Sequence, residues 1–197
     1  MRPLVFVLPH ALVFWAIDLW AFAPEFAIVA RARKAAAENS SKDSGSLQLI
    51  VMGMWVGMLI SFPISFVRPL RFPLWIVPPA FYIGSGTLLA GSLLRRHCWR
   101  VLGEYFTGEV RARTNQPVID RGAYRWVRHP SYSGGILMFA GIGMELGSWA
   151  SLAIVTFVAV TVYAYRIHIE ERALIQAIGA PYIAYMRTRK RIIPFII

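Results

Sequence analysis

The strongest chemical signal in the sequence is a polar stretch, residues 122–134, that leads into an apolar segment at Pro130. Proline is favoured at the first position of a helix, where its missing backbone N–H costs nothing. The next N–H groups, near Ser131 and Tyr132, are expected to point out of the helix end, where the helix dipole favours negative charge. His129 and Tyr132 add side-chain donors. The stretch therefore predicts a site for a carboxylate or phosphate, and a plain helix start is the simpler alternative.

A second polar stretch, residues 165–172, directly follows the last long apolar segment. Arg166 and Glu170 are four residues apart, so they share one face if a helix continues there. Arginine binds carboxylates through a bidentate fork, which suits the polar head of a lipid-anchored substrate. An exposed ion pair, worth roughly 0.3–0.5 kcal/mol, is the simpler alternative. Glu171 and Arg172 are expected on other faces of the helix, in solvent.

The composition indicates that a membrane protein holds these two stretches. Of the 197 residues, 57% are apolar and 16% are charged, against about 45–50% and about 25% in a soluble domain. This excludes a disordered chain and an ordinary water-soluble enzyme. The single cysteine, Cys98, excludes a disulfide framework, and the four scattered histidines predict no metal site.

Five apolar runs predict an all-α fold, an integral membrane bundle of five transmembrane helices in a single domain over residues 1–197. The second run has 21 residues, and about 31 Å of helix is enough to cross the hydrocarbon. The last two runs have about 17 residues each, the lower limit for crossing, and a two-residue break predicts a tight hairpin between them. The runs are residues 4–30, 47–67, 72–94, 130–146 and 149–165.

The basic residues divide unequally between the two sides of that bundle. Eighteen Lys and Arg residues fall in residues 31–46, 95–128 and 166–197, and only three fall on the other side. Basic residues collect in cytoplasmic loops, so we expect the N-terminus outside and the C-terminus, with both polar stretches, in the cytoplasm. The same rule accounts for the net charge of +11 without a nucleic-acid partner.

In the second run, Gly53 and Gly57 form a Gly-x-x-x-Gly pair, which permits close contact between helices. Such a pair serves internal packing or a contact with a second chain, and the sequence does not decide between them. The oligomeric state is therefore not predicted, although a monomer is compatible with everything above.

Together the two polar stretches resemble the isoprenylcysteine carboxyl methyltransferase family, whose relatives include membrane phospholipid N-methyltransferases and the C-terminal part of sterol reductases. The shared pattern is Arg-His-Pro-x-Tyr-x-Gly, a short helical hairpin, Glu-Glu, Tyr-x-x-Tyr and a basic stretch ending in proline. Here it falls on residues 128–134, 170–171, 182–185 and 191–194. The resemblance covers about residues 109–195.

The resemblance implies S-adenosylmethionine as methyl donor, bound in a cytoplasmic pocket formed by residues 95–132 and 166–197 and released as S-adenosylhomocysteine. Glu109 stands where the family can have Gln. The family's substrate-side Arg and Glu fall on Arg166 and Glu170, which are the predicted catalytic and substrate-binding residues. The implied cofactor-binding residues are Glu109, Gln116, Pro117, Val118, Ile119, Tyr124, His129, Pro130, Ser131 and Tyr132.

The implied reaction is O-methylation of the carboxylate of a C-terminal prenylated cysteine or an analogue. A carboxylate is ionised at neutral pH, so alignment and exclusion of water matter more than a strong base. The prenyl tail of this lipidated substrate is expected to reach the site from the bilayer, between helices.

Three other functions stay open. A phospholipid N-methyltransferase acting on an ethanolamine lipid would need a base, for which Glu170 is the candidate. A reductase with a nicotinamide cofactor is disfavoured because those proteins have more spans. A membrane scaffold or channel subunit could use Asp18 and Glu145 as pathway residues, but each lies near the end of its run and is expected to reach the outer interface.

Overall fold

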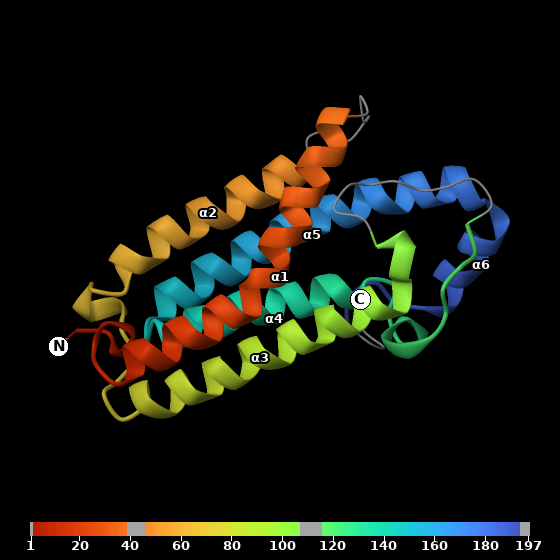
Figure 1. Cartoon of the computed structure of the whole chain (residues 1–197). Helices are drawn as coiled ribbons and strands as arrows, with labels where there is room; N and C mark the ends of the chain where they lie inside the picture. The colour runs from red at the N-terminus through yellow and green to blue at the C-terminus, as the bar shows by residue number, and fades with distance from the viewer. Residues whose placement is uncertain (1, 39–45, 107–115, 194–197) are drawn as a thin grey trace.

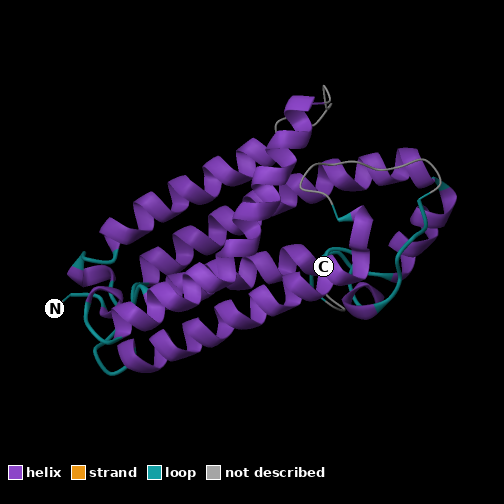
Figure 2. Cartoon of the chain, viewed as in Figure 1, coloured by secondary structure: helices purple, strands orange, loops and turns teal. Residues whose placement is uncertain are grey.

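The computed structural model describes residues 2–38, 46–106 and 116–193, and this part of the chain is built from helices without a β-strand (Figure 2). The all-α prediction is confirmed. Short 3₁₀ helices at Leu4–Phe6, Arg68–Leu70, Gly103–Tyr105 and Gly122–Arg125 connect the main elements. The main helices are α1 (His10–Glu38), α2 (Ser46–Ile64), α3 (Val77–Leu102), α4 (Pro130–Glu145), α5 (Trp149–Ile178) and α6 (Ala180–Thr188).

Four segments of the described chain are long and apolar enough to cross a membrane, as expected of an integral membrane protein. They are His10–Ala30, Leu47–Ile64, Val77–Tyr105 and Trp149–Ile178. The fourth predicted run forms α4, whose 16 residues give only about 24 Å of helix. A fifth crossing therefore remains a prediction.

The predicted limits of the third run, residues 72–94, are wrong at both ends. The helix begins at Val77, after Pro73, and continues to Leu102. It extends through Arg95 and Arg96 because both guanidinium groups bind α1: Arg95 pairs with Glu25, and Arg96 donates to the Trp20 carbonyl at 2.7 Å. The first helix is displaced from the predicted run of residues 4–30: α1 begins only at His10 and continues to Glu38.

Neighbouring helices pack antiparallel to each other: α3 against α4, α4 against α5, and α2 against α5 (Figure 1). Glycines allow a close approach between α3 and α4. A Cβ on Gly91 would lie 2.5 Å from the carbonyl oxygen of Gly134, and a Cβ on Gly84 would lie 2.6 Å from that of Gly141. The two glycines of each helix are seven residues apart, or about two turns, so one face of each helix supplies both contacts.

The Gly-x-x-x-Gly pair of α2 serves internal packing, the first of the two alternatives. A Cβ on Gly53 would lie 2.8 Å from a methyl group of Val162, and one on Gly57 would lie 3.4 Å from Val158. Both valines belong to α5, so these glycines let α2 settle onto α5 within the same chain.

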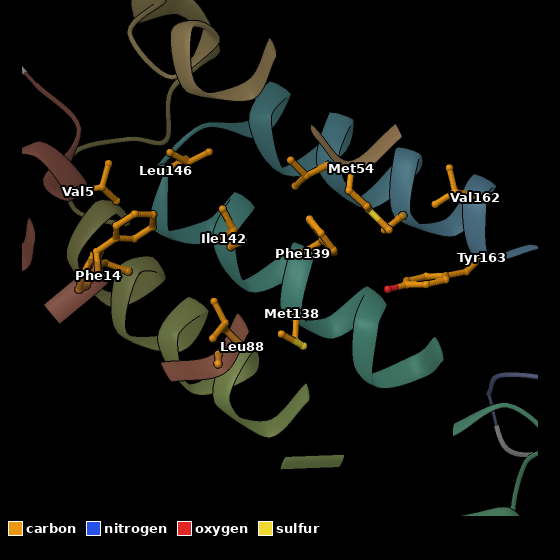
Figure 3. Close-up of a cluster of buried hydrophobic side chains, with 14 residues drawn as sticks. Val5, Phe14, Met54, Leu88, Met138, Phe139, Ile142, Leu146, Val162 and Tyr163 are labelled. Atoms are coloured by element: carbon orange, nitrogen blue, oxygen red, sulfur yellow. The ribbon is translucent and has the colours of Figure 1, made fainter. Parts of the chain in front are cut away.

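One hydrophobic cluster fills the interior and draws on α1 to α5 (Figure 3). Phe14, Leu88, Met138 and Ile142 are each at most 1% exposed. Tyr163 closes the cluster at one end, and its side chain also lines the cavity described below. The core therefore fixes one wall of that cavity.

The chain turns gather at the two ends of the bundle (Figure 1). At one end the N–H of Phe72 donates to the Gly147 carbonyl at 2.9 Å, and the Ser148 hydroxyl donates to the Leu70 carbonyl at 2.9 Å. These bonds tie the α2–α3 turn to the α4–α5 hairpin turn. The two polar stretches lie at the opposite end of the bundle, where α4 begins (Figure 1).

The expectation that Asp18 and Glu145 reach the outer interface is wrong. Asp18 is 8% exposed and Glu145 is 1% exposed, and the Ser85 hydroxyl donates to Glu145 at 2.6 Å. Both carboxyl groups point into the bundle because neighbouring helices cover the faces that carry them.

Candidate active site

A cavity of about 190 Å³ opens at the end of the bundle where the two polar stretches meet. Its walls come from all six helices and from residues 116–119. Pro130 does not line it, although the residues on either side do, and Glu109 lies outside the described residues. Ten predicted site residues line the cavity: Gln116, Pro117, Val118, Ile119, Tyr124, His129, Ser131, Tyr132, Arg166 and Glu170.

The start of α4 forms one wall of the cavity. His129 precedes the helix and Pro130 is its first residue. The N–H groups of Tyr132 and Ser133 both donate to the His129 carbonyl, at 3.1 Å and 3.3 Å. The expectation that the Tyr132 N–H is open to a ligand is therefore wrong, because the first turn of the helix is tight enough to use it. The side chains of His129, Ser131 and Tyr132 remain at the cavity wall.

The two polar stretches meet at Tyr132. Its hydroxyl donates to Glu170 Oε2 at 2.6 Å and also hydrogen-bonds the Arg166 guanidinium. His129 stacks on the Tyr132 ring, with 5.7 Å between ring centroids, and its Nδ1 lies 4.0 Å from Glu170 Oε2. Arg166 is only 3% exposed. The plain alternative of a solvated Arg166–Glu170 pair is therefore wrong, since the guanidinium is enclosed within the site.

Glu171 was expected in solvent, and this prediction is wrong. It is 4% exposed. Its Oε1 lies 2.9 Å from Arg128 Nη2 and 3.2 Å from His129 Nε2, and Oε2 accepts from Arg191 Nε and Nη2 at 3.1 Å and 3.0 Å. Glu171 does lie on a different face of α5 from Arg166, but the chain segments around residues 128 and 191 cover that face.

The C-terminal segment is tied to the stretch before α4 by backbone hydrogen bonds. The N–H groups of Arg128 and His129 donate to the carbonyls of Lys190 and Arg191, at 2.8 Å and 2.9 Å, and the Ser133 hydroxyl donates to the Ile192 carbonyl at 2.8 Å. Residues 190–192 thus run alongside residues 127–129. This contact fixes the segment that precedes the Pro130 helix start.

α6, which precedes the C-terminal segment, also forms part of the cavity wall. The hydroxyl of Tyr185 donates to the Tyr124 carbonyl at 2.7 Å, and both tyrosines line the cavity. Burial, and then the nearby Asp120 carboxylate, raises the pKa of Tyr185 to about 12. The hydroxyl therefore keeps its proton and remains a donor at neutral pH.

Sequence reasoning missed two charged residues of the cavity, Arg95 and Glu25. The Arg95 guanidinium forms a bidentate ion pair with the Glu25 carboxylate, and Arg95 Nη1 also donates to the Ser131 carbonyl at 2.9 Å. Arg95 was placed in a polar loop because the third apolar run ends just before it. One signal was available: Glu25 and Asp18 are the only acidic residues in residues 4–30.

The rest of the lining includes an aliphatic surface from the first two helices. Ile28 and Val29 of α1 and Leu47, Ile50 and Val51 of α2 contribute to it. The cavity therefore combines a charged and aromatic surface with an aliphatic one. In the described part of the chain, no group of three or more His, Cys, Asp or Glu side chains could hold a metal ion.

Comparison with known proteins finds the same family that the motifs resemble. Residues 84–176 match the sequence model of the isoprenylcysteine carboxyl methyltransferase (ICMT) family. The predicted resemblance is real. The matched region begins within α3, so α1 and α2 lie outside it.

Curated relatives of the chain are named as isoprenylcysteine methyltransferases. The chain is 29% identical over 136 residues to the protein-S-isoprenylcysteine O-methyltransferase of Schizosaccharomyces pombe, covering 66% of this chain and 58% of that protein. It is 31% identical over 116 residues to the protein-S-isoprenylcysteine O-methyltransferase of Saccharomyces cerevisiae, covering 58% of this chain and 48% of that protein. The chain thus spans about half of the length of these relatives.

The fold is shared with a solved structure as well. The eukaryotic intramembrane Ras methyltransferase ICMT superposes with a TM-score of 0.64 and 22% sequence identity, over 98% of this chain and 70% of that one. The likeness includes α1 and α2, which the family match in the sequence does not reach. The whole helical arrangement described above is therefore an ICMT-type membrane fold.

Proposed function

We propose that the protein is an S-adenosylmethionine-dependent methyltransferase that O-methylates the carboxylate of a C-terminal prenylated cysteine or an analogue of it. The single observation that carries the proposal is the meeting of Arg166, Tyr132 and Glu170 beside the start of α4, in a cavity that also has an aliphatic surface. Such a cavity suits one polar ligand and one lipid-bearing ligand. The matched family and the curated relatives support the same reaction.

We assign the donor site to the start of α4 and the segments that cover it. The side chains of Tyr124, His129, Ser131 and Tyr132, with residues 116–119, would hold S-adenosylmethionine. Their hydroxyl and imidazole groups suit its amino-acid end and its ribose. When bound, the donor supplies a methyl group already activated by the sulfonium. Glu109 stays a predicted contact, and Pro130 acts by setting the helix start.

We assign the acceptor site to Arg166 and Glu170. The buried Arg166 guanidinium would grip the substrate carboxylate, because a carboxylate accepts two parallel N–H bonds from arginine. Glu170 and Tyr132 hold Arg166 in place through the shared hydroxyl. A lipid tail would lie along the aliphatic residues of α1 and α2, reached from the bilayer. The C-terminal segment and α6 exclude water from the reacting groups.

In the bilayer we place five crossings, with α4 and α5 as the last two, the N-terminus outside and the cavity at the cytoplasmic face. The excess of basic residues at the cavity end supports this orientation. The donor would then enter from the cytoplasm and the acceptor from the inner leaflet. A monomer contains every residue of the site that is described above.

The test uses the detergent-purified protein, radiolabelled S-adenosylmethionine and a small S-prenylcysteine analogue. Arg166→Ala is expected to lower methyl transfer by at least about 100-fold while calorimetry shows the affinity for S-adenosylhomocysteine within about threefold of the parent. Arg172→Ala, an exposed neighbour on α5, is the matched control and should change neither. Equal loss of transfer and donor binding in Arg166→Ala contradicts this division of the site.

The second candidate is N-methylation of an ethanolamine phospholipid. The Glu170 carboxylate at the cavity wall favours it, because an amine must lose a proton to a base. Base-labile label on the prenylcysteine analogue supports the ester, and stable label in phospholipid supports the amine. Binding of NADPH in place of S-adenosylhomocysteine would contradict both and indicate a reductase.

A further inference from the structure

The first helix contributes a charged residue to the cavity, although no motif lies in it. Glu25 of α1 binds Arg95 of α3 through both carboxylate oxygens: Arg95 Nε meets Oε1, and Arg95 Nη2 donates to Oε2 at 2.6 Å. The exposed fraction of the side chain is 9% for Arg95 and 20% for Glu25. The pair is thus largely enclosed, and both residues line the cavity.

Arg95 uses its remaining terminal nitrogen on the first turn of α4. Arg95 Nη1 donates to the Ser131 carbonyl at 2.9 Å and lies 3.3 Å from the Ser131 hydroxyl. The aliphatic stem of Arg95 also packs at the same place, since a Cβ on Gly134 would lie 2.8 Å from Arg95 Cγ. One side chain therefore contacts α1 and the start of α4 at once.

We propose that Glu25 and Arg95 are a positioning pair through which α1 sets the place of the first turn of α4. Glu25 orients the guanidinium, and the oriented guanidinium holds the Ser131 carbonyl at the cavity wall. Neither residue needs to touch a ligand to do so. The effect of the pair on donor affinity rests on the proposed function, whereas its effect on the position of the first turn of α4 does not.

The chemistry of the pair explains why these two residue types are required. A guanidinium is a rigid planar fork that can bind a carboxylate on one side and a carbonyl on the other. A lysine at position 95 would keep the charge and one contact with Glu25, but a single ammonium would not make both sets of bonds. A glutamine at position 25 would keep the shape and leave the buried guanidinium without its counter-charge.

Arg96 provides a matched control in the next position. It also links α3 to α1, through a 2.7 Å hydrogen bond to the Trp20 carbonyl and stacking over the Trp20 ring at 4.0 Å. Arg96 does not line the cavity. Arg96→Gln therefore weakens the contact between the same two helices without touching the first turn of α4.

The experiment measures amide hydrogen exchange by mass spectrometry on the detergent-purified full chain without ligand. Glu25→Gln and Arg95→Lys are each expected to speed exchange of the amides of residues 132–136 by about tenfold, or about 1.4 kcal/mol of local opening. Arg96→Gln should leave those amides at the parent rate. Unchanged exchange in both cavity variants, or an equal rise in Arg96→Gln, overturns the proposal.

A second measurement tests the link to donor binding. Calorimetry is expected to show that Glu25→Gln and Arg95→Lys bind S-adenosylhomocysteine about tenfold more weakly than the parent, with Arg96→Gln unchanged. If the parent itself does not bind S-adenosylhomocysteine, the proposed function fails, and hydrogen exchange alone still decides whether the pair positions α4. Parent-like affinity in both variants, with a parent that binds, contradicts the assigned role at the donor site.

Discussion

The close contact of α3 and α4 leads to a sharp prediction for Gly91→Ala. An ideal Cβ on Gly91 lies 2.5 Å from the Gly134 carbonyl oxygen, 2.9 Å from the Met138 backbone nitrogen and 2.9 Å from Met138 Cγ. A carbon and a carbonyl oxygen ordinarily stay about 3.3 Å apart or more. Two of the three atoms belong to the backbone, so no side-chain rotation relieves the clash. The two helices must move apart by close to 1 Å at this level.

The cost follows from the packing and from a control on the same helix. Overfilling a well-packed interior costs about 1–3 kcal/mol. Alanine gains up to about 1 kcal/mol over glycine as a helix former, which offsets part of that cost. Gly86 also lies in α3, and a Cβ there meets nothing within 4 Å. Gly86→Ala makes the same chemical change without the clash, so the difference between the two variants isolates the steric cost.

Thermal unfolding in detergent, followed by circular dichroism, measures that difference. A change of 1 kcal/mol shifts the melting temperature of a chain of this size by about 2–4 °C. Gly91→Ala is therefore expected to melt about 2–12 °C below Gly86→Ala. A Gly91→Ala protein that melts at or above Gly86→Ala would refute the argument that backbone contact between α3 and α4 is tight.

Two further predictions concern the cover of the cavity. Glu171→Gln should destabilise the fold by about 1.5–3 kcal/mol, because Arg128 and Arg191 lose a charged partner. Limited proteolysis should also cut the C-terminal segment of this variant faster. Unchanged melting and cleavage would contradict the contacts described. Tyr185→Phe should cost about 1 kcal/mol at neutral pH, because the Tyr124 carbonyl loses its donor. The folded-state pKa of Tyr185, about 12, lies above the ordinary tyrosine value of 10.0, so the stabilising effect of its hydroxyl holds below pH 10 and is lost as pH rises towards 12. Tyr185→Phe should therefore lose less stability than the parent over that range in alkaline thermal melts.

Some features of the site could be predicted because they depend on residues close together in the chain. Pro130 after a polar stretch predicts a helix start, and α4 does begin there. The spacing of Arg166 and Glu170 predicts a shared face, and both line the cavity. These predictions hold because helical periodicity and proline geometry act over only a few residues.

Other features required contacts between distant segments. Glu171 was expected in solvent because nothing next to it in sequence would bury it, yet residues 128 and 191 supply the partners that do. Arg95 was placed in a loop because hydrophobicity falls there, yet its pairing with Glu25, 70 residues away, lies within the helical bundle. In both cases a charge becomes buried only because an opposite charge arrives from elsewhere in the fold.

The sequence by itself determined the helical class, the apolar segments, the hairpin of α4 and α5, and most of the residues that surround the cavity. The helical class and the apolar segments follow from composition, the hairpin follows from the short break between two apolar runs, and most of the cavity residues follow from the resemblance to the family. The tertiary structure decided which faces meet: the glycine contact of α3 with α4, the tie between Glu171 and the C-terminal segment, and the link from α1 to Ser131. Those depend on the rotation and height of one helix against another, which no pattern within a single helix specifies.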